Sequence, residues 1–103
     1  MNLSDTPLSE VEIRAALREA LAHHRAGQLQ DAVDIYRGVQ AQIPDNPEIL
    51  VSLGAALLGL ELAAEAIEPL ERALSVRPGH ALTCFTLAEA YRREARIEDA
   101  YEA

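Results

Sequence analysis

Apolar residues recur along this chain with the period of an α-helix. In residues 50–57, LVSLGAAL, they stand at positions i, i+3, i+4 and i+7, which is the spacing of one helix face. Residues 66–74, AIEPLERAL, carry a second stripe of this kind after a break near 61–63. No stretch alternates apolar and polar residues over a useful length, so no β-strand is predicted. The pattern therefore predicts an all-α protein built from paired helices.

Capping signals indicate where the first helix begins and ends. Ser9 and Glu12 have the spacing of a capping box, in which each side chain accepts a hydrogen bond from the other residue's backbone. The first helix should therefore begin near Leu8. Gly27 can adopt the left-handed backbone conformation that ends a helix.

Segments that contain proline separate the later helices. PDNP at 44–47 and RPGH at 77–80 are stop-and-turn signals, and each follows a helical pattern. Pro69 is unusual because it falls inside a helical pattern that should begin near Ala64. Since it removes only one backbone hydrogen bond just past the first turn, we expect a mild bend there and not a break.

These features repeat at an interval of 34 residues. Ala32, Ala66 and Ala100 are one interval apart, and so are Pro44 and Pro78. A fixed period of this length is the signature of a repeat architecture. The repeats divide a single domain, 1–103, into an N-terminal extension with the first helix start, 1–12, two complete units, 13–46 and 47–80, and an incomplete unit, 81–103.

The interval and the residue sizes together resemble the tetratricopeptide repeat. The resemblance implies an α-solenoid of antiparallel helical hairpins, wound as a right-handed superhelix, with about two and a half repeats. It also places Cys84, at a position where the family often has Trp, in the core as an unreactive buried thiol. The second unit fits at all of the signature positions, which hold Leu50, Leu53, Gly54, Leu57, Ala66, Leu70, Ala73 and Pro78.

The third unit is incomplete in this sequence. After Tyr91, residues 97–103 could form about two turns of a second helix. Hairpins of a repeat protein do not bury their own apolar faces, so neighbours must cover one another. The last full helix, with Leu82, Phe85 and Leu87, is therefore expected to be only partly covered unless further chain or another molecule packs on it.

Composition argues against several classes of function. The chain has 103 residues and a formal net charge of −8, which argues against a nucleic acid partner. Its single cysteine cannot form an internal disulfide, and a reducing compartment is the simplest interpretation. The start of the chain lacks the features of a secretion signal, and no uncharged apolar run reaches about 18 residues. We therefore predict a cytoplasmic location and no membrane partner.

No motif predicts catalysis or metal binding. His23 and His24 are adjacent, so their side chains diverge by about 100° on a helix and cannot share a metal. His80 lies in a predicted turn, and no zinc spacing, glycine-rich phosphate loop or GxSxG motif occurs. We predict that the protein is not an enzyme, and that it has no catalytic residue, cofactor or metal.

The resemblance implies a concave groove lined by the first helix of each hairpin. Five of the nine arginines map to this face, with an apolar strip between them. Because the groove has no lysine or asparagine, the family's clamp for a terminal carboxylate is not expected. An apolar peptide or helix with flanking acidic residues fits better, since apolar burial sets affinity and arginines set register. The predicted groove residues are Arg14, Leu17, Arg18, Leu21, His24, Arg25, Glu48, Val51, Ser52, Ala55, Leu58, Leu82, Phe85, Thr86, Glu89, Arg92 and Arg93.

Two alternatives for these residues stay open. Leu17 and Leu21 could belong to the core if the first helix is rotated from the family register. The arginines could instead pair with Glu10, Glu19 and Glu94 along their own helices.

Three functions fit these features. The first is a non-catalytic adaptor, chaperone or scaffold that binds a protein or peptide partner in the groove. The second is the N-terminal repeat array of a larger bacterial enzyme, such as a glycosyltransferase, where the repeats recruit substrate. The third is a self-assembly module that forms a homo-oligomer through uncapped C-terminal helices.

Overall fold

The computed structural model describes the backbone of residues 7–102 and the side chains of residues 7–96. Over these residues the chain is helical, with no strand, which confirms the all-α prediction. The helices are α1 (Glu10–Arg25), α2 (Leu29–Gln40), α3 (Pro47–Gly59), α4 (Ala63–Val76) and α5 (Ala81–Glu102).

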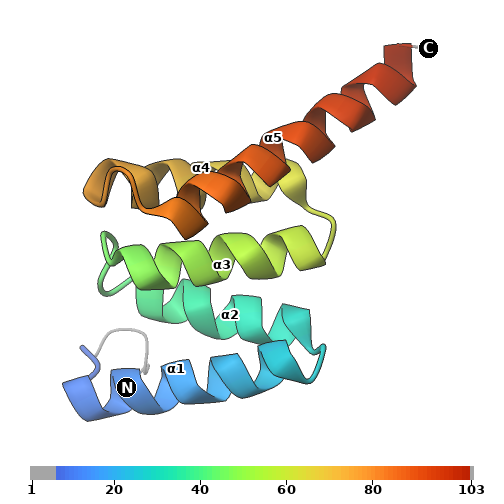
Figure 1. Ribbon diagram of the computed structural model, residues 1–103. Coiled ribbons are helices and arrows are strands. Elements are labelled where there is room, and N and C mark those ends of the chain that lie inside the picture. Colours follow the sequence, from blue (N-terminus) through green and yellow to red (C-terminus); the bar gives the residue numbers. More distant parts are fainter. Residues whose placement is uncertain (1–6, 103) are drawn as a thin grey trace.

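Consecutive helices pack against one another along the whole chain, α1 on α2, α2 on α3, α3 on α4 and α4 on α5. Figure 1 shows that successive helices run in opposite directions and that α3 passes in front of α2, as α5 does in front of α4. The odd-numbered helices therefore form one face of the stack. At the C-terminal end, α5 projects beyond the other helices (Figure 1).

The helix ends follow the predicted local signals. The Ser9 hydroxyl accepts a hydrogen bond from the Glu12 amide at 3.2 Å, and the Glu12 carboxylate accepts one from the Ser9 amide at 3.1 Å. Ser9 is the N-cap of α1. The hydrogen bonds with Ser9 lower the pKa of the Glu12 carboxyl. Gly27 follows α1 with a φ of 82°, which confirms its predicted left-handed conformation.

The second hairpin turns in the same way at the equivalent position. Glu61 stands 34 residues after Gly27 and also has a positive φ, of 62°. Asn46 caps α3, because its side chain accepts hydrogen bonds from the Glu48 and Ile49 amides. Pro69 lies inside α4, and the helix continues past it to Val76 without a break.

Small residues set how closely the paired helices approach. Ala20 in α1 and Gly54 in α3 are both buried, and they are one repeat interval apart. A Cβ atom on Gly54 would lie only 2.5 Å from the Cγ atom of Leu70 in α4. Because Leu70 is completely buried, α4 packs on α3 at a distance that requires glycine at position 54.

The third unit differs from the predicted hairpin. Ala95 occupies the position of Gly27 and Glu61, yet it lies inside α5, which runs from Ala81 to Glu102 without a turn. Alanine has the highest helix propensity and adopts the left-handed conformation at a cost, so the continuous helix is locally favoured. The side chains of residues 97–103, including the predicted small residue Ala100, lie outside the described part of the chain.

The prediction that Cys84 is a buried thiol is wrong. Cys84 is exposed, and no helix within the described residues covers that side of α5. Leu82 and Phe85 are also exposed, whereas Leu87 is buried against α3 and α4 side chains in the core. The expectation that the last helix is only partly covered is therefore confirmed.

Candidate functional site

The face made by α1, α3 and α5 carries two neighbouring cavities. The first lies between α1 and α3 and has a volume of about 170 Å³. Leu17 and Leu21 line one wall, and the Tyr36 side chain from α2 forms the floor. Burial raises the pKa of the Tyr36 hydroxyl, although a hydrogen bond with the Ser52 side chain acts in the opposite direction.

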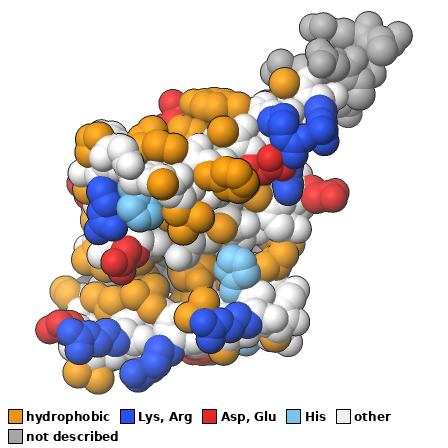
Figure 2. All heavy atoms as spheres, viewed as in Figure 1, with side chains coloured by type: hydrophobic (Ala, Val, Ile, Leu, Met, Phe, Trp, Pro, Cys, Tyr) orange, Lys and Arg blue, Asp and Glu red, His pale blue; other side chains and the backbone are white. Residues whose placement is uncertain are grey.

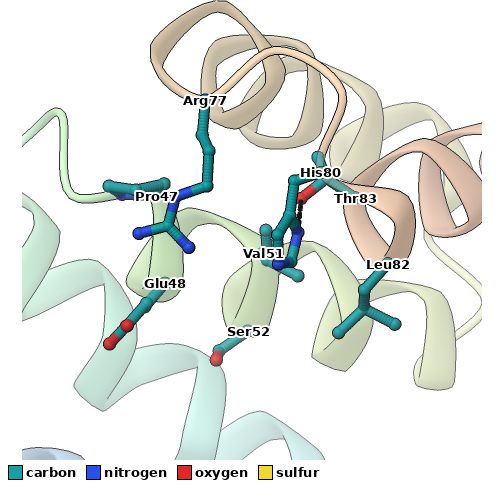
Figure 3. Close-up of a pocket in the computed structure, with 8 residues that line it drawn as sticks. All are labelled: Pro47, Glu48, Val51, Ser52, Arg77, His80, Leu82 and Thr83. Atoms are coloured by element: carbon teal, nitrogen blue, oxygen red, sulfur yellow. Dashed lines mark hydrogen bonds between the residues drawn. The ribbon is translucent and has the colours of Figure 1, made fainter.

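The second cavity lies between the start of α3 and the start of α5, and its volume is about 230 Å³. Figure 3 shows Arg77 and His80 entering it from the loop between α4 and α5. The Nδ1 atom of His80 lies 2.9 Å from the hydroxyl oxygen of Thr83, which is almost completely buried. This contact holds the imidazole ring at the edge of the cavity. The remaining lining residues are Pro47, Glu48, Val51, Ser52 and Leu82.

The two cavities adjoin at α3, where Glu48 and Ser52 line both of them. We call the residues that line the two cavities the groove. Large apolar side chains stand exposed along it or next to it, with Leu21 42 % exposed, Leu82 59 % and Phe85 73 %. Figure 2 shows this face, with apolar side chains in the middle and basic side chains over α1 and α5.

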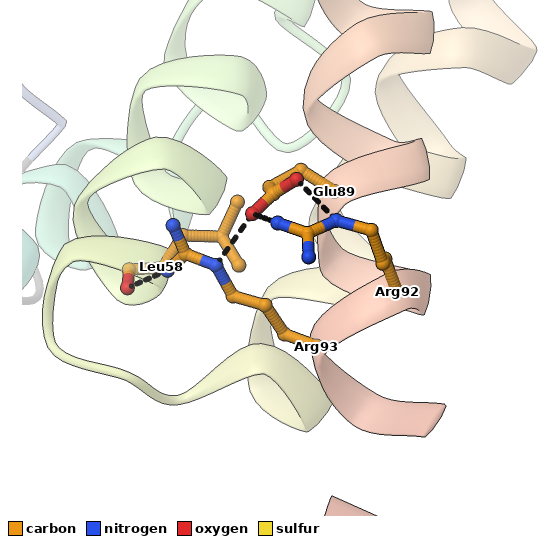
Figure 4. Close-up of polar contacts among 4 residues, drawn as sticks. All are labelled: Leu58, Glu89, Arg92 and Arg93. Carbon is orange, nitrogen blue, oxygen red and sulfur yellow. Dashed lines mark hydrogen bonds and ion pairs between the residues drawn. The ribbon is translucent and has the colours of Figure 1, made fainter. Parts of the chain in front are cut away.

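Arg92 and Arg93, in the middle of α5, are engaged in local contacts (Figure 4). The Nη1 atom of Arg93 donates a hydrogen bond of 2.9 Å to the Leu58 carbonyl at the C-terminal end of α3. The Glu89 carboxylate accepts hydrogen bonds from both Arg92 and Arg93, at 2.9 Å and 2.8 Å from their Nε atoms. These hydrogen bonds lower the pKa of the Glu89 carboxyl. The cluster therefore joins α5 to α3.

The α1 arginines differ in whether they have a partner. Arg14 pairs with Glu10 at 2.7 Å, which agrees with the alternative of pairing along one helix. Arg18 and Arg25 form no ion pair with any residue that the structure describes, and the same holds for Arg77. Together with Arg96 of α5, these three guanidinium groups have no ion-pair partner among the described residues.

The structure brings several predicted groove residues together. Leu17, Leu21 and Ser52 meet in the first cavity, and Val51, Ser52 and Leu82 meet in the second. Leu17 is only partly buried and packs against the core as well, so the two interpretations of this residue overlap.

Other predicted groove residues lie outside the cavities. Leu58 is buried, with its side chain 6 % exposed, and Thr86 donates its hydroxyl hydrogen bond to the Leu82 carbonyl. Ala55 and His24 are partly buried. None of these four residues lines either cavity.

Sequence reasoning missed six groove residues, which are Tyr36, Pro47, Ile49, Arg77, His80 and Thr83. Arg77 and His80 lie in the RPGH segment, which the sequence marked only as a turn. The available signal was that a cation and an imidazole directly precede a helix whose first turn is apolar.

No group of three or more His, Cys, Asp or Glu side chains among the described residues could hold a metal ion. No helix in that part of the chain is long and apolar enough to cross a membrane. No protein-family model matches the sequence, and a search of curated proteins returned no match.

Proposed function

We propose that this chain is a tetratricopeptide-like α-solenoid that acts as a non-catalytic protein interaction module in the cytoplasm. Its partner is a peptide or helix that lies in the groove across α1, α3 and α5. The observation that carries the proposal is that the two cavities adjoin at Glu48 and Ser52. Adjoining cavities can take neighbouring side chains of one extended ligand, whereas a single cavity of this size would hold one side chain.

The exposed apolar residues support binding of a macromolecule. Phe85 lies one helical turn after Leu82 and exposes 73 % of its surface, although burial of a side chain of this size stabilises by roughly 1.5–3 kcal/mol. The partner segment would place apolar side chains over Leu82 and Phe85 and between Leu17 and Leu21. This burial would supply most of the affinity.

Charge defines the rest of the partner. Arg77 lines the groove, and Arg18 and Arg25 belong to α1, whose Leu17 and Leu21 line it. None of these arginines has an ion-pair partner among the described residues. Acidic residues on either side of the apolar segment would meet these guanidinium groups. Exposed pairs contribute only about 0–1 kcal/mol each, so they would set register and association rate more than affinity.

Selection from a peptide display library tests this proposal without a known partner. Peptides that bind the chain should share an apolar segment flanked by Asp or Glu. Leu82→Asp and Phe85→Asp should each raise the dissociation constant of the selected peptides by roughly 10-fold to 100-fold, since each change removes one buried apolar contact. Val11→Asp is the matched control, because Val11 is 74 % exposed and lines neither cavity. Selected peptides that bind all three variants equally would refute the proposal.

A further inference from the structure

No helix within the described residues packs over one side of α5, whereas the following helix covers the same side of α1 and of α3. We call Cys84, Ala88 and Tyr91 the α5 outer face; they are spaced i, i+4 and i+7, and all three are exposed. In the second hairpin the equivalent positions, 34 residues earlier, are Leu50, Gly54 and Leu57, and α4 covers them.

The second hairpin shows what shape fits such a face. Leu70 of α4 lies directly over Gly54, so closely that a Cβ atom there would be 2.5 Å from its Cγ atom. Ala88 is the equivalent of Gly54, and it has only one more carbon atom. Because that carbon atom displaces the facing side chain, a helix that carries a Leu-sized residue would pack on α5 roughly 1 Å farther out than α4 packs on α3.

The charge next to this face points to the chemistry of the occupant. In the body of the protein Arg37 of α2 pairs with Glu65 of α4 at 3.8 Å, so the second helices of successive hairpins meet through opposite charges. The residues 34 positions later are Glu71 and Asp99, which are both acidic. If the chain's own C-terminal residues occupied the equivalent place, two carboxylates would oppose each other, which is unfavourable.

The Glu71 side chain is positioned at the edge of this face. Glu71 is exposed on α4, and its carboxylate is close enough to the Tyr91 hydroxyl to affect the pKa of that hydroxyl. Burial and the neighbouring carboxylate both raise the pKa of that hydroxyl, so Tyr91 stays a neutral donor. A cation from an incoming helix would meet Glu71 in the way that Arg37 meets Glu65.

We propose that the α5 outer face binds an amphipathic helix of a second protein, with a Leu-sized residue over Ala88 and an Arg or Lys facing Glu71. This site is separate from the groove and has the opposite charge preference, so it does not depend on the proposed function. A second copy of the chain is less suited, since each copy has a net charge of −8.

A peptide taken from the protein itself provides the probe. The peptide is Ala63–Val76, the sequence of the helix that covers α3. In a second peptide, Glu65→Arg places a cation opposite Glu71. Fluorescence anisotropy should give a dissociation constant roughly threefold to tenfold lower for this peptide than for the unchanged one. Glu71→Gln in the protein should remove that preference.

Variants of the protein identify the surface that the peptide occupies. Ala88→Arg should raise the dissociation constants of both peptides at least about tenfold, because the Arg side chain fills the space of the peptide's Leu side chain. It also adds a positive charge near the Arg of the second peptide. Ala15→Arg is the matched control, since Ala15 is also an exposed alanine within a helix. Both positions are exposed, so neither variant disturbs the core.

Three results would overturn the inference. The first is equal affinity for the two peptides, and the second is the absence of binding at millimolar peptide. The third is a dimer, seen by light scattering, that Ala88→Arg dissociates, because a second copy would then be the occupant. The Leu82→Asp and Phe85→Asp variants report on the groove alone, so a failure there leaves this test unaffected.

Discussion

Gly54→Ala should destabilise the protein, although the same change stabilises most helices. Gly54 lies within α3, where alanine is ordinarily favoured by about 1 kcal/mol. Here the added Cβ atom would lie 2.5 Å, 2.6 Å and 3.0 Å from the Cγ and two Cδ atoms of Leu70. Carbon atoms pack at about 3.5–4.0 Å, so Leu70 or the helix axis must move by roughly 1 Å. Leu70 cannot swing into solvent because it is completely buried.

The magnitude follows from two opposing contributions. Overpacking of a tight core costs typically 1–3 kcal/mol, and the gain in helix propensity is about 1 kcal/mol. We therefore expect Gly54→Ala to lower the free energy of unfolding by about 0–2 kcal/mol. Gly38→Ala is the matched control in α2, because a Cβ atom there would meet nothing within 4 Å. It should raise the free energy of unfolding by up to about 1 kcal/mol.

Urea unfolding followed by circular dichroism measures both variants. The two free energies of unfolding should differ by about 1–3 kcal/mol, with the Gly38→Ala variant the more stable. Unchanged m-values would show that the denatured states are comparable. If Gly54→Ala stabilised the protein as much as Gly38→Ala does, α4 would not pack on α3 at the described distance, and the comparison with Ala88 would lose its basis.

Three further predictions follow from the described contacts. Gly27 and Glu61 both have a positive φ, which favours glycine. In urea unfolding, Gly27→Ala should therefore lower the free energy of unfolding by about 1 kcal/mol, and Glu61→Gly should raise it by a similar amount. Changes of the same sign in the two variants would refute this. Cys84 should react with a thiol reagent in the folded protein as fast as in urea, because it is exposed; reaction only on unfolding would contradict its exposure. The pKa of Glu89 is lowered in the folded state, so its contribution to stability should be complete above its ordinary value of 4.5 and disappear as the pH falls through the lowered value. Glu89→Gln should therefore approach the parent chain in stability in acid, and a gap that persists there would refute the linkage.

The helices and their boundaries could be predicted from the sequence because their causes are local. The capping box of Ser9 and Glu12 and the left-handed conformation of Gly27 depend on residues a few positions apart. The burial of Gly54 follows from its place in a stripe with helical period. In these cases propensity, capping and periodicity favour the same conformation.

The third unit could not be predicted in this way, because its conformation depends on what packs against it. Cys84 stands at the position of Leu50, and periodicity alone assigns both to the core. Leu50 is buried because α4 follows α3 through the turn at Glu61, whereas α5 continues as a helix through Ala95. The groove residues Arg77 and His80 were missed for a similar reason, since a turn signal does not show which cavity the turn borders.

The repeat interval separates residues that hold the fold from residues that distinguish its surfaces. Small residues persist through Ala20, Gly54 and Ala88, because every hairpin needs the same close approach of helices. Charged and polar residues do not persist in this way: Arg37 becomes Glu71, and Ile43 and Asn46 become Arg77 and His80. Packing explains the first group. It places no demand on Glu71 and Arg77, whose side chains are exposed, and His80 lies at a cavity edge. A repeat scaffold that must recognise particular partners can vary only these positions without loss of stability. The departures from the repeat therefore lie where we place the two binding surfaces, with Arg77 and His80 at the groove and Glu71 beside the α5 outer face.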